Sequence, residues 1–280
     1  MTQDNIQTAI DAGKGLAAKV EIILGIPTLV GPHGALPLAE VLKLSDARAS
    51  EPRRRTGTAT LQAIDSFCEH VNRFKSEASA VFADEANRQF VGVLNYHPSG
   101  AESAPAWGDH RALYKCPLSD EWKTWGGGEE RRASQDQFAL WLDAHDRDLA
   151  TNTADANGNP YPSPADLMTL AATLEAYSNS KSRRTRDPAN GRISVEYTAE
   201  DGVKGGLVTI PRAFAIRIPV FTDSALAPIE VRLRVEISDG KAAFVFGIHD
   251  ATKVLRAAFG DLVQLVRDAV ALPVFIGTPE

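Results

Sequence analysis

The densest group of polar side chains in the sequence is a short acidic segment that contains one histidine. Asp143, His145, Asp146 and Asp148 lie close together in the chain, and carboxylates and imidazoles are common ligands of divalent cations. On a helix, ligands that share a face are three or four residues apart, and among the first three residues only the two aspartates meet that spacing. We therefore rank a metal-dependent hydrolase built on Asp143, His145 and Asp146 last of three hypotheses, and a solvated helix end is the simpler interpretation.

Two histidines could in principle serve nucleophilic catalysis. His97 and His110 flank a loop-like segment, and Asp109 precedes the second histidine. A serine hydrolase needs a nucleophile on a sharp turn, and the chain contains no Gly-x-Ser-x-Gly segment. The glycines at 126–128 are not followed by the Lys-Ser or Lys-Thr of a phosphate-binding loop. We therefore expect no catalytic residues, no metal and no cofactor.

Two clusters of basic residues could contact phosphates, because arginine forks match phosphate oxygens. They are Arg53, Arg54 and Arg55 in the first cluster and Lys181, Arg183, Arg184 and Arg186 in the second. The net charge of the chain is −6, so no global positive field gathers nucleic acid and any such contact is local. The alternative interpretation is that both clusters lie in solvated loops. In a symmetric oligomer each basic patch would be repeated in every subunit, so weak phosphate contacts could add up.

The four tryptophans are concentrated in one part of the chain. Trp107, Trp122, Trp125 and Trp141 all fall between residues 107 and 141. Clustered aromatic side chains bury large areas and anchor both cores and subunit interfaces. The cluster is therefore either a local core or a candidate interface.

The remaining pattern predicts a folded α+β protein. The chain has 280 residues, of which 44% are hydrophobic and 24% charged, as in ordinary globular proteins. Helical spacing of apolar residues predicts helices over 6–20, 58–74, 135–148, 163–174 and 250–272. Short strands are expected at 80–83, 90–96, 111–116, 193–197, 214–218, 230–237 and 242–248.

The ends of several elements are marked by specific residues. Ser163 is the expected N-cap of its helix, with Pro164 at the first helical position and Asp166 three residues after the cap. The turn before Lys241 predicts that the last two strands form an antiparallel hairpin. The proline-rich segment from Ile26 to Pro37 is expected to be an extended connector.

We therefore expect N-terminal helices with a small antiparallel sheet, followed by a C-terminal antiparallel sheet that a terminal helix covers. The basic segment at 179–190 is interpreted as an exposed connection, which places a boundary between residues 1–180 and 181–280, unless both parts form one compact unit. Cys68 and Cys116 are expected to be reduced core thiols, because two cysteines cannot build a disulfide framework. No membrane span and no export signal is expected, which indicates a cytoplasmic protein.

A series of aromatic residues and short strands resembles a known family. The residues that carry it include Val93-Leu-Asn-Tyr-His97, Trp107-Gly-Asp-His110, Glu121-Trp122-x-x-Trp125 and Phe214-x-Ile-x-Ile-Pro219. They are similar to the YfdQ-like family of phage and prophage proteins of unknown function, over roughly Leu36 to Gly277. The resemblance transfers no site residues. It implies a phage-encoded protein that is located inside the host cell and whose gene often lies near replication and recombination genes.

The leading hypothesis is therefore a non-enzymatic phage or prophage accessory protein. It would act through homo-oligomerisation and through binding of a host or phage protein, with the four tryptophans as candidate interface residues. The alternative is a nucleic-acid-binding module of phage replication or recombination that uses the two basic clusters.

Overall fold

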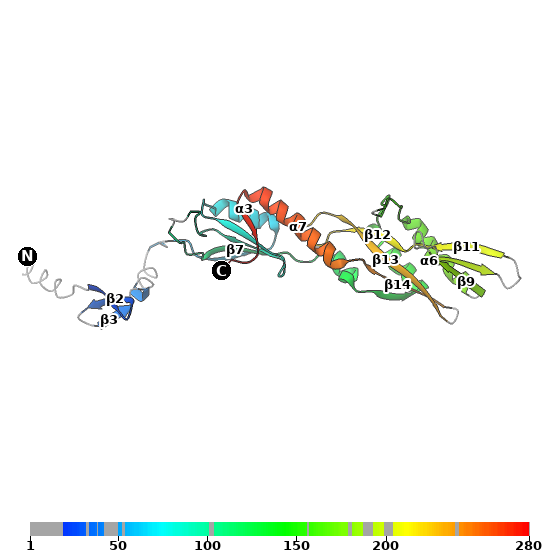
Figure 1. Cartoon of the computed structure of the whole chain (residues 1–280), viewed down its shortest axis with the longest axis horizontal. Helices are drawn as coiled ribbons and strands as arrows, with labels where there is room; N and C mark the ends of the chain where they lie inside the picture. The colour runs from blue at the N-terminus through cyan, green and yellow to red at the C-terminus, as the bar shows by residue number, and fades with distance from the viewer. Residues whose placement is uncertain are drawn as a thin grey trace, which may run out of the picture. The chain divides into compact units, whose positions relative to one another are not determined.

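The computed structural model divides into two compact units (Figure 1). The first is Met1–Gly57 and the second is Thr58–Glu280. The residues described are 19–31, 34–37, 39–41, 50–51, 54–100, 104–155, 157–178, 181–186, 193–198, 204–238 and 241–279.

The first unit contains a small antiparallel sheet. Its strands are hydrogen-bonded in the order β1 (Lys19–Ile23), β2 (Ile26–Gly31) and β3 (Gly34–Pro37). Leu24 and Gly25 form the turn between β1 and β2, with φ values of 51° and 79°, as a type I′ hairpin turn requires. The extended connector expected here is thus largely paired β-structure. The helix expected over 6–20 lies outside the described residues except for its last two positions, which belong to β1.

The second unit contains a five-stranded sheet. Its strands, in spatial order, are β15 (Val274–Ile276), β5 (Ala80–Asp84), β6 (Gln89–Val93), β7 (His110–Lys115) and β4 (Gly57–Leu61). The antiparallel pairing of β5, β6 and β7 confirms the three expected strands, whereas β15 joins β5 in parallel. α3 (Ile64–Phe74) begins later than the helix expected from residue 58, because Thr58 and Thr60 lie in β4. Such β-branched residues favour strands.

Gly92 in β6 lets α3 approach the five-stranded sheet closely. A Cβ atom at this position would lie 2.9 Å from Cγ2 of Val71 and 3.6 Å from Cζ of Phe67. Phe67 in turn packs on Phe90, with ring centroids 6.1 Å apart. The absence of a side chain at Gly92 therefore sets the helix-to-sheet distance.

A second sheet has four strands. Their order is β12 (Ala213–Ile218), β13 (Ala227–Ser238), β14 (Lys241–Ile248) and β8 (Arg131–Ser134), all antiparallel. The pairing of Ser238 with Lys241 confirms the predicted hairpin. Val231, Leu233 and Val235 are buried whereas the intervening residues are exposed, as the alternation predicts.

A third sheet corrects the interpretation of the basic segment as a connecting loop. Its strands are β11 (Lys204–Ile210), β10 (Ile193–Thr198) and β9 (Lys181–Arg186), in that order. Both neighbours of β10 are antiparallel to it. The second basic cluster is therefore an edge strand of a sheet.

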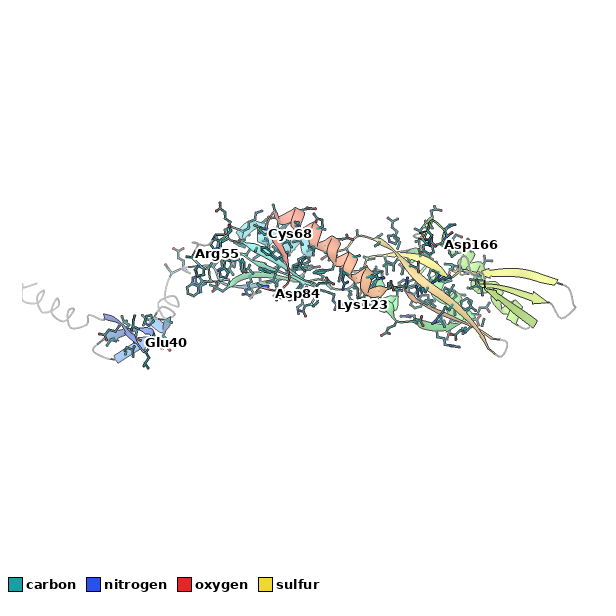
Figure 2. The ribbon with its side chains drawn as sticks, viewed as in Figure 1. Glu40, Arg55, Cys68, Asp84, Lys123 and Asp166 are labelled. Carbon is teal, nitrogen blue, oxygen red and sulfur yellow. The ribbon has the colours of Figure 1, made fainter. Side chains whose placement is uncertain are left out.

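Helices and short 3-10 turns flank β8 in the chain and come before β12. They are α4 (Asp120–Thr124), η1 (Gly126–Gly128), α5 (Gln135–Ala144), η2 (Asp146–Asp148) and α6 (Pro164–Ser178). Phe138 of α5 stacks on Phe244 of β14, with ring centroids 4.5 Å apart. The predicted cap of α6 is confirmed: Ser163 Oγ accepts from the Asp166 N–H at 3.2 Å, and Asp166 Oδ2 accepts from the Ser163 N–H at 3.1 Å. Asp166 is labelled in Figure 2.

The last helix, α7 (Ala251–Val270), follows the C-terminal strands as expected. It lies beside α3 (Figure 1), and its Phe259 stacks on Phe90 of β6 at 5.3 Å between ring centroids. The four-stranded sheet is instead contacted by α5 and α6 through β14. The final strand β15 then returns the chain to the five-stranded sheet.

One continuous core joins the sheets and helices of the second unit, because the main cluster of buried apolar side chains extends from Ile64 to Val270. The α+β class is confirmed by helices packed on largely antiparallel sheets. The division at residue 180 stays a prediction. β8, which precedes it, and β12 to β14, which follow it, share one sheet.

Candidate functional site

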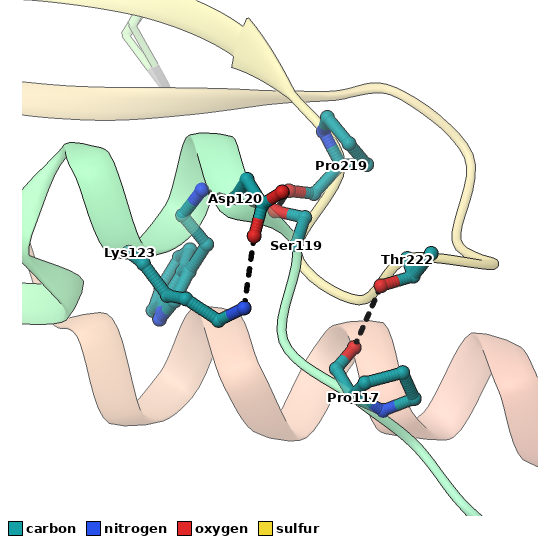
Figure 3. Close-up of polar contacts among 7 residues, drawn as sticks. Pro117, Ser119, Asp120, Lys123, Pro219 and Thr222 are labelled. Carbon is teal, nitrogen blue, oxygen red and sulfur yellow. Dashed lines mark hydrogen bonds and ion pairs between the residues drawn. The ribbon is translucent and has the colours of Figure 1, made fainter.

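A crossing of two loops positions the short helix that carries Trp122 (Figure 3). The Thr222 hydroxyl donates to the Pro117 carbonyl at 3.4 Å, as Figure 3 shows, and the Thr222 N–H donates to the same oxygen at 2.9 Å. The Ser119 hydroxyl donates to the Pro219 carbonyl at 2.6 Å. Ser119 also caps α4, because its Oγ accepts from the Trp122 N–H at 3.0 Å. One serine therefore joins the β12–β13 loop to the helix that carries Trp122.

The tryptophans divide between core and surface. Trp122 and Trp125 are buried in the main core, and Nε1 of Trp125 donates to Oδ2 of Asp148 at 2.8 Å. Trp141 is half-buried, and Trp107 is 76% exposed. The local-core alternative therefore describes Trp122 and Trp125, whereas Trp107 remains a candidate interface residue.

Trp141 contacts both a cation and a histidine ring. The Arg131 guanidinium lies 4.2 Å from the indole centroid, and the His145 ring lies 4.0 Å from it. Arg131 also donates to the Thr124 carbonyl at 2.6 Å. The cation–π contact of Arg131 with Trp141 holds α5 against the start of β8.

The acidic segment around His145 forms a helix end. Asp143 lies in α5, His145 is its C-cap and Asp146 begins η2. Nδ1 of His145 is 2.8 Å from the Trp141 carbonyl oxygen. Within the described part of the chain, no three His, Cys, Asp or Glu side chains come together in a way that could hold a metal ion.

The histidines near residue 100 have local structural contacts. His97 Nδ1 accepts from the Ala106 N–H at 3.1 Å, and the His110 ring packs on Phe74 at 5.6 Å between centroids. The glycines of η1 all have positive φ and form a tight turn rather than a phosphate-binding loop.

A buried polar group lies between β7 and the β12–β13 loop. The Tyr114 hydroxyl donates to Asp223 Oδ2 at 2.5 Å, and the same oxygen accepts from the Ile64 N–H at 3.1 Å. Burial, reinforced by the hydrogen bond to Asp223, raises the pKa of the Tyr114 phenol. Asp223 therefore anchors the start of α3 to the second half of the chain.

The two cysteines are free and buried, as expected; Cys68 is labelled in Figure 2. Burial, followed by the charge of Asp65, raises the pKa of the Cys68 thiol from 9.0 to about 11. Burial, followed by the charge of Asp223, raises the pKa of the Cys116 thiol to about 12. Because the thiolate is the reactive form of cysteine, neither residue is activated for nucleophilic chemistry at neutral pH.

The two basic clusters belong to different units. Arg54 and Arg55 are exposed residues of the first unit, and Arg53 lies outside the described residues. Lys181, Arg183, Arg184 and Arg186 all lie in β9 of the second unit. The structure therefore unites the members of the second cluster on one strand.

The sequence interpretation missed an exposed apolar hairpin tip in the first unit. At the β1–β2 turn, Ile22 is 77% exposed, Leu24 is 97% exposed and Ile26 is 53% exposed. Thr28 is the sole buried residue among those of the first unit whose burial is described. The signal was present as the uncharged run Ile22-Ile-Leu-Gly-Ile26, which also fits a buried strand.

Comparison with known proteins places the chain in a family. The model of an uncharacterized conserved protein family, DUF2303, matches residues 5–279, so the chain belongs to that family. No curated protein and no solved structure matches the chain. Membership confirms the expectation of a family of unknown function. No helix within the described residues has the length and apolar content of a membrane span.

Proposed function

We propose that the protein is a non-enzymatic phage or prophage accessory protein of the YfdQ-like kind. It acts in the cytoplasm of the host cell by associating with itself and by binding a host or phage protein. The exposed hairpin tip of the first unit is the observation that carries this proposal. Membership in a family of unknown function is compatible with it.

The hairpin tip differs from an ordinary exposed apolar residue. Single hydrophobic residues are common on protein surfaces, but contiguous exposed ones mark interaction sites. Ile22, Ile23, Leu24 and Ile26 are all exposed large apolar residues on one turn. Asn, Asp and Gly are the usual residues of such a turn, so Leu24 at φ 51° is locally unfavourable and is better explained by a contact that it makes.

The small sheet behind the tip cannot bury these side chains itself. β1, β2 and β3 contain five, six and four residues, and small isolated sheets are marginally stable in water. An open sheet also presents strand edges that pair readily with another strand. A second copy of the chain supplies both a matching edge and a matching apolar tip, in a two-fold symmetric contact.

The test is the native mass of the full chain and of a tip variant. Leu24→Asn removes the exposed apolar side chain and creates an Asn-Gly turn, which favours the observed hairpin. Multi-angle light scattering over micromolar concentrations should give more than the 30.1 kDa of one chain for the wild type and the monomer mass for the variant. The matched control is Leu226→Asn, at a loop leucine that is 57% exposed, which should leave the assembly intact.

Two results would overturn the proposal. The first is a wild-type chain that is monomeric throughout the concentration range. The second is a Leu24→Asn variant that assembles like the wild type, because the tip would then not be the contact.

A further inference from the structure

The five-stranded sheet has two faces with different surroundings. On one face, Phe90 of β6 packs against aromatic rings of α3 and α7 as part of the main core. Side chains alternate between the two faces of a strand, so the strand pairing places a row of apolar residues on the opposite face, namely Phe275, Phe82, Val91 and Leu113. We call the face that carries this row the open face. Its Phe82 belongs to a small buried cluster that is separate from the main core.

The apolar row of the open face is accessible from solvent along most of its length. Phe275 of β15 is 49% exposed, and its ring centroid lies 5.5 Å from that of Phe82. Val91 and Leu113, at the other end of the row, are partly exposed. A partner laid across β15, β5, β6 and β7 would therefore contact the row on each side of the buried Phe82.

Two further aromatic residues border the open face from outside its strands. The Tyr96 ring centroid lies 5.2 Å from that of Phe82. Gly108 lies over Val93, because a Cβ atom built on this glycine would be 4.0 Å from Cγ1 of Val93. Trp107, which precedes that glycine, is 76% exposed. The open face thus has aromatic side chains beside its strands as well as on them.

The accessible charge of the open face is positive. The charged residues of these strands that alternation places on this face are Asp84, Arg111 and Lys115. Asp84 is only 5% exposed and accepts hydrogen bonds from three amide N–H groups. Lys115 is exposed and Arg111 is half-buried. The open face therefore complements an anionic partner, although the net charge of the chain is −6.

Aromatic and cationic side chains on one sheet face are suited to single-stranded nucleic acid. Unpaired bases stack on aromatic rings, and phosphates bind arginine and lysine. A duplex fits poorly, because its bases already stack on one another and because five strands span about 19 Å, more than the roughly 12 Å of a major groove. A purely apolar protein segment would match the row but not the two cations.

We propose that the open face binds single-stranded nucleic acid, with bases stacked on Phe275, Tyr96 and Trp107 and with phosphates bound by Arg111 and Lys115. Sheets that bind RNA in this way stack two or three bases on their aromatic residues. The contacts involve base rings and phosphates, so the affinity depends little on base sequence. The inference does not depend on the self-association proposed above.

The first test is the salt dependence of binding, measured by fluorescence anisotropy of labelled nucleic acids with the full chain. The probes are oligothymidine and oligouridine of about 20 nucleotides, which exceeds the usual site size of one module, and a DNA duplex of the same length. The single strands should bind more tightly than the duplex. Two phosphate contacts predict a slope of roughly −1.4 for log K against log salt concentration.

The contribution of one cation is tested by Lys115→Gln. This change should bring the slope closer to zero by about 0.7. The control is Arg217→Gln, at an exposed arginine of β12, which should leave the slope unchanged.

Substitutions at Phe275 separate base stacking from a simple apolar contact. Phe275→Ala removes the ring and should weaken single-strand binding about 5- to 150-fold, and Trp107→Ala should have an effect in the same range. Phe275→Tyr keeps a ring and should bind like the wild type. Phe275→Leu keeps an apolar side chain without an aromatic face and should bind like Phe275→Ala. The control is Leu140→Ala, at a helical leucine that is 68% exposed, which should not change the affinity.

Folding and self-association are controlled in the same assay. Circular dichroism compares the folding of every variant, and wild-type binding by Phe275→Tyr shows that the edge strand tolerates substitution. Leu24→Asn should bind the single strands with the wild-type slope, because the open face lies in the second unit. A Leu24→Asn variant that still assembles would overturn the proposed self-association and leave this inference intact.

Four outcomes would overturn the inference. The first is no binding of either single strand at low salt, and the second is a duplex that binds as tightly as the single strands. The third is a Phe275→Leu variant that binds like the wild type, which would indicate an apolar protein partner. The fourth is wild-type affinity in both Phe275→Ala and Trp107→Ala, because no base would then stack on these rings.

Discussion

The two units differ in whether their large apolar side chains are buried or exposed. In the second unit Trp122, Trp125 and Tyr114 are buried in one continuous core. In the first unit Leu24 is 97% exposed at the end of a hairpin. Burial of apolar surface is the main driving force of folding. The second unit therefore has a core that accounts for its own stability, and the proposal above assigns the stabilisation of the first unit to a contact with another copy of the chain.

The largest expected loss in the free energy of unfolding comes from truncating a buried tryptophan of the second unit. Trp125→Ala leaves a cavity and an unpaired Asp148, so the free energy of unfolding should fall by about 3–5 kcal/mol. Denaturant titration measures this change. Trp107→Ala removes the same group from an exposed position and should cost less than about 1 kcal/mol; equal losses would contradict the division of the tryptophans into core and surface.

Overpacking at Gly92 should have the next largest effect. Gly92→Ala places a Cβ atom 2.9 Å from Val71, and the resulting displacement of α3 should cost about 1–3 kcal/mol. Gly260 in α7 has no atom within 4 Å of a built Cβ, so Gly260→Ala should stabilise the protein by about 0.5–1 kcal/mol. Thermal unfolding of the two variants should shift in opposite directions.

Asp84 should give a smaller, pH-dependent effect. It accepts hydrogen bonds from the Asn87 N–H and side chain and from Gln89, and the Asn87 side chain is the largest cause that lowers its pKa. The stabilisation is present above the ordinary pKa of 3.8 and is lost as pH falls through the lowered pKa of the folded state.

Asp84→Ala should therefore cost about 1–3 kcal/mol at pH 7. The difference from the wild type should shrink towards pH 2 in urea titrations at several pH values. A penalty that is constant with pH would show that packing, not the charged carboxylate, accounts for the loss.

The smallest effect is expected in the first unit. Thr28→Ala removes the hydrogen bond from Oγ1 to the Ile26 carbonyl at 2.9 Å, yet the main unfolding transition should move by less than about 0.5 kcal/mol. Calorimetry of the monomeric Leu24→Asn background makes this comparison. A large shift would mean that the two units unfold together and that the second unit does not account for its stability alone.

Local patterns in the sequence predicted much of the second unit. The Ser163 cap, the three strands before residue 116 and the hairpin of β13 and β14 depend on short-range spacing and turn residues, and all are present. The same reasoning misjudged residues 58–61 and 181–186. Both became strands through pairing with chain segments that a local pattern does not reveal.

The candidate site was harder to foresee than the fold. Four basic residues among six predict a solvated connection, and only the backbone pairing with β10 shows that they belong to an edge strand. From the sequence alone, the uncharged run from Ile22 to Ile26 predicts a buried strand. Whether its side chains are exposed depends on tertiary packing, which a local pattern does not reveal.

Residue types and spacing thus determined the α+β class, the Ser163 cap, the reduced thiols and the absence of a recognisable catalytic motif, because these follow from interactions between near neighbours. Tertiary structure decided which tryptophans enter the core, which sheet α7 contacts and where the basic residues lie. Burial and strand pairing join residues far apart in the chain, such as Tyr114 with Asp223, and the free energy of such contacts depends on the complete arrangement around them.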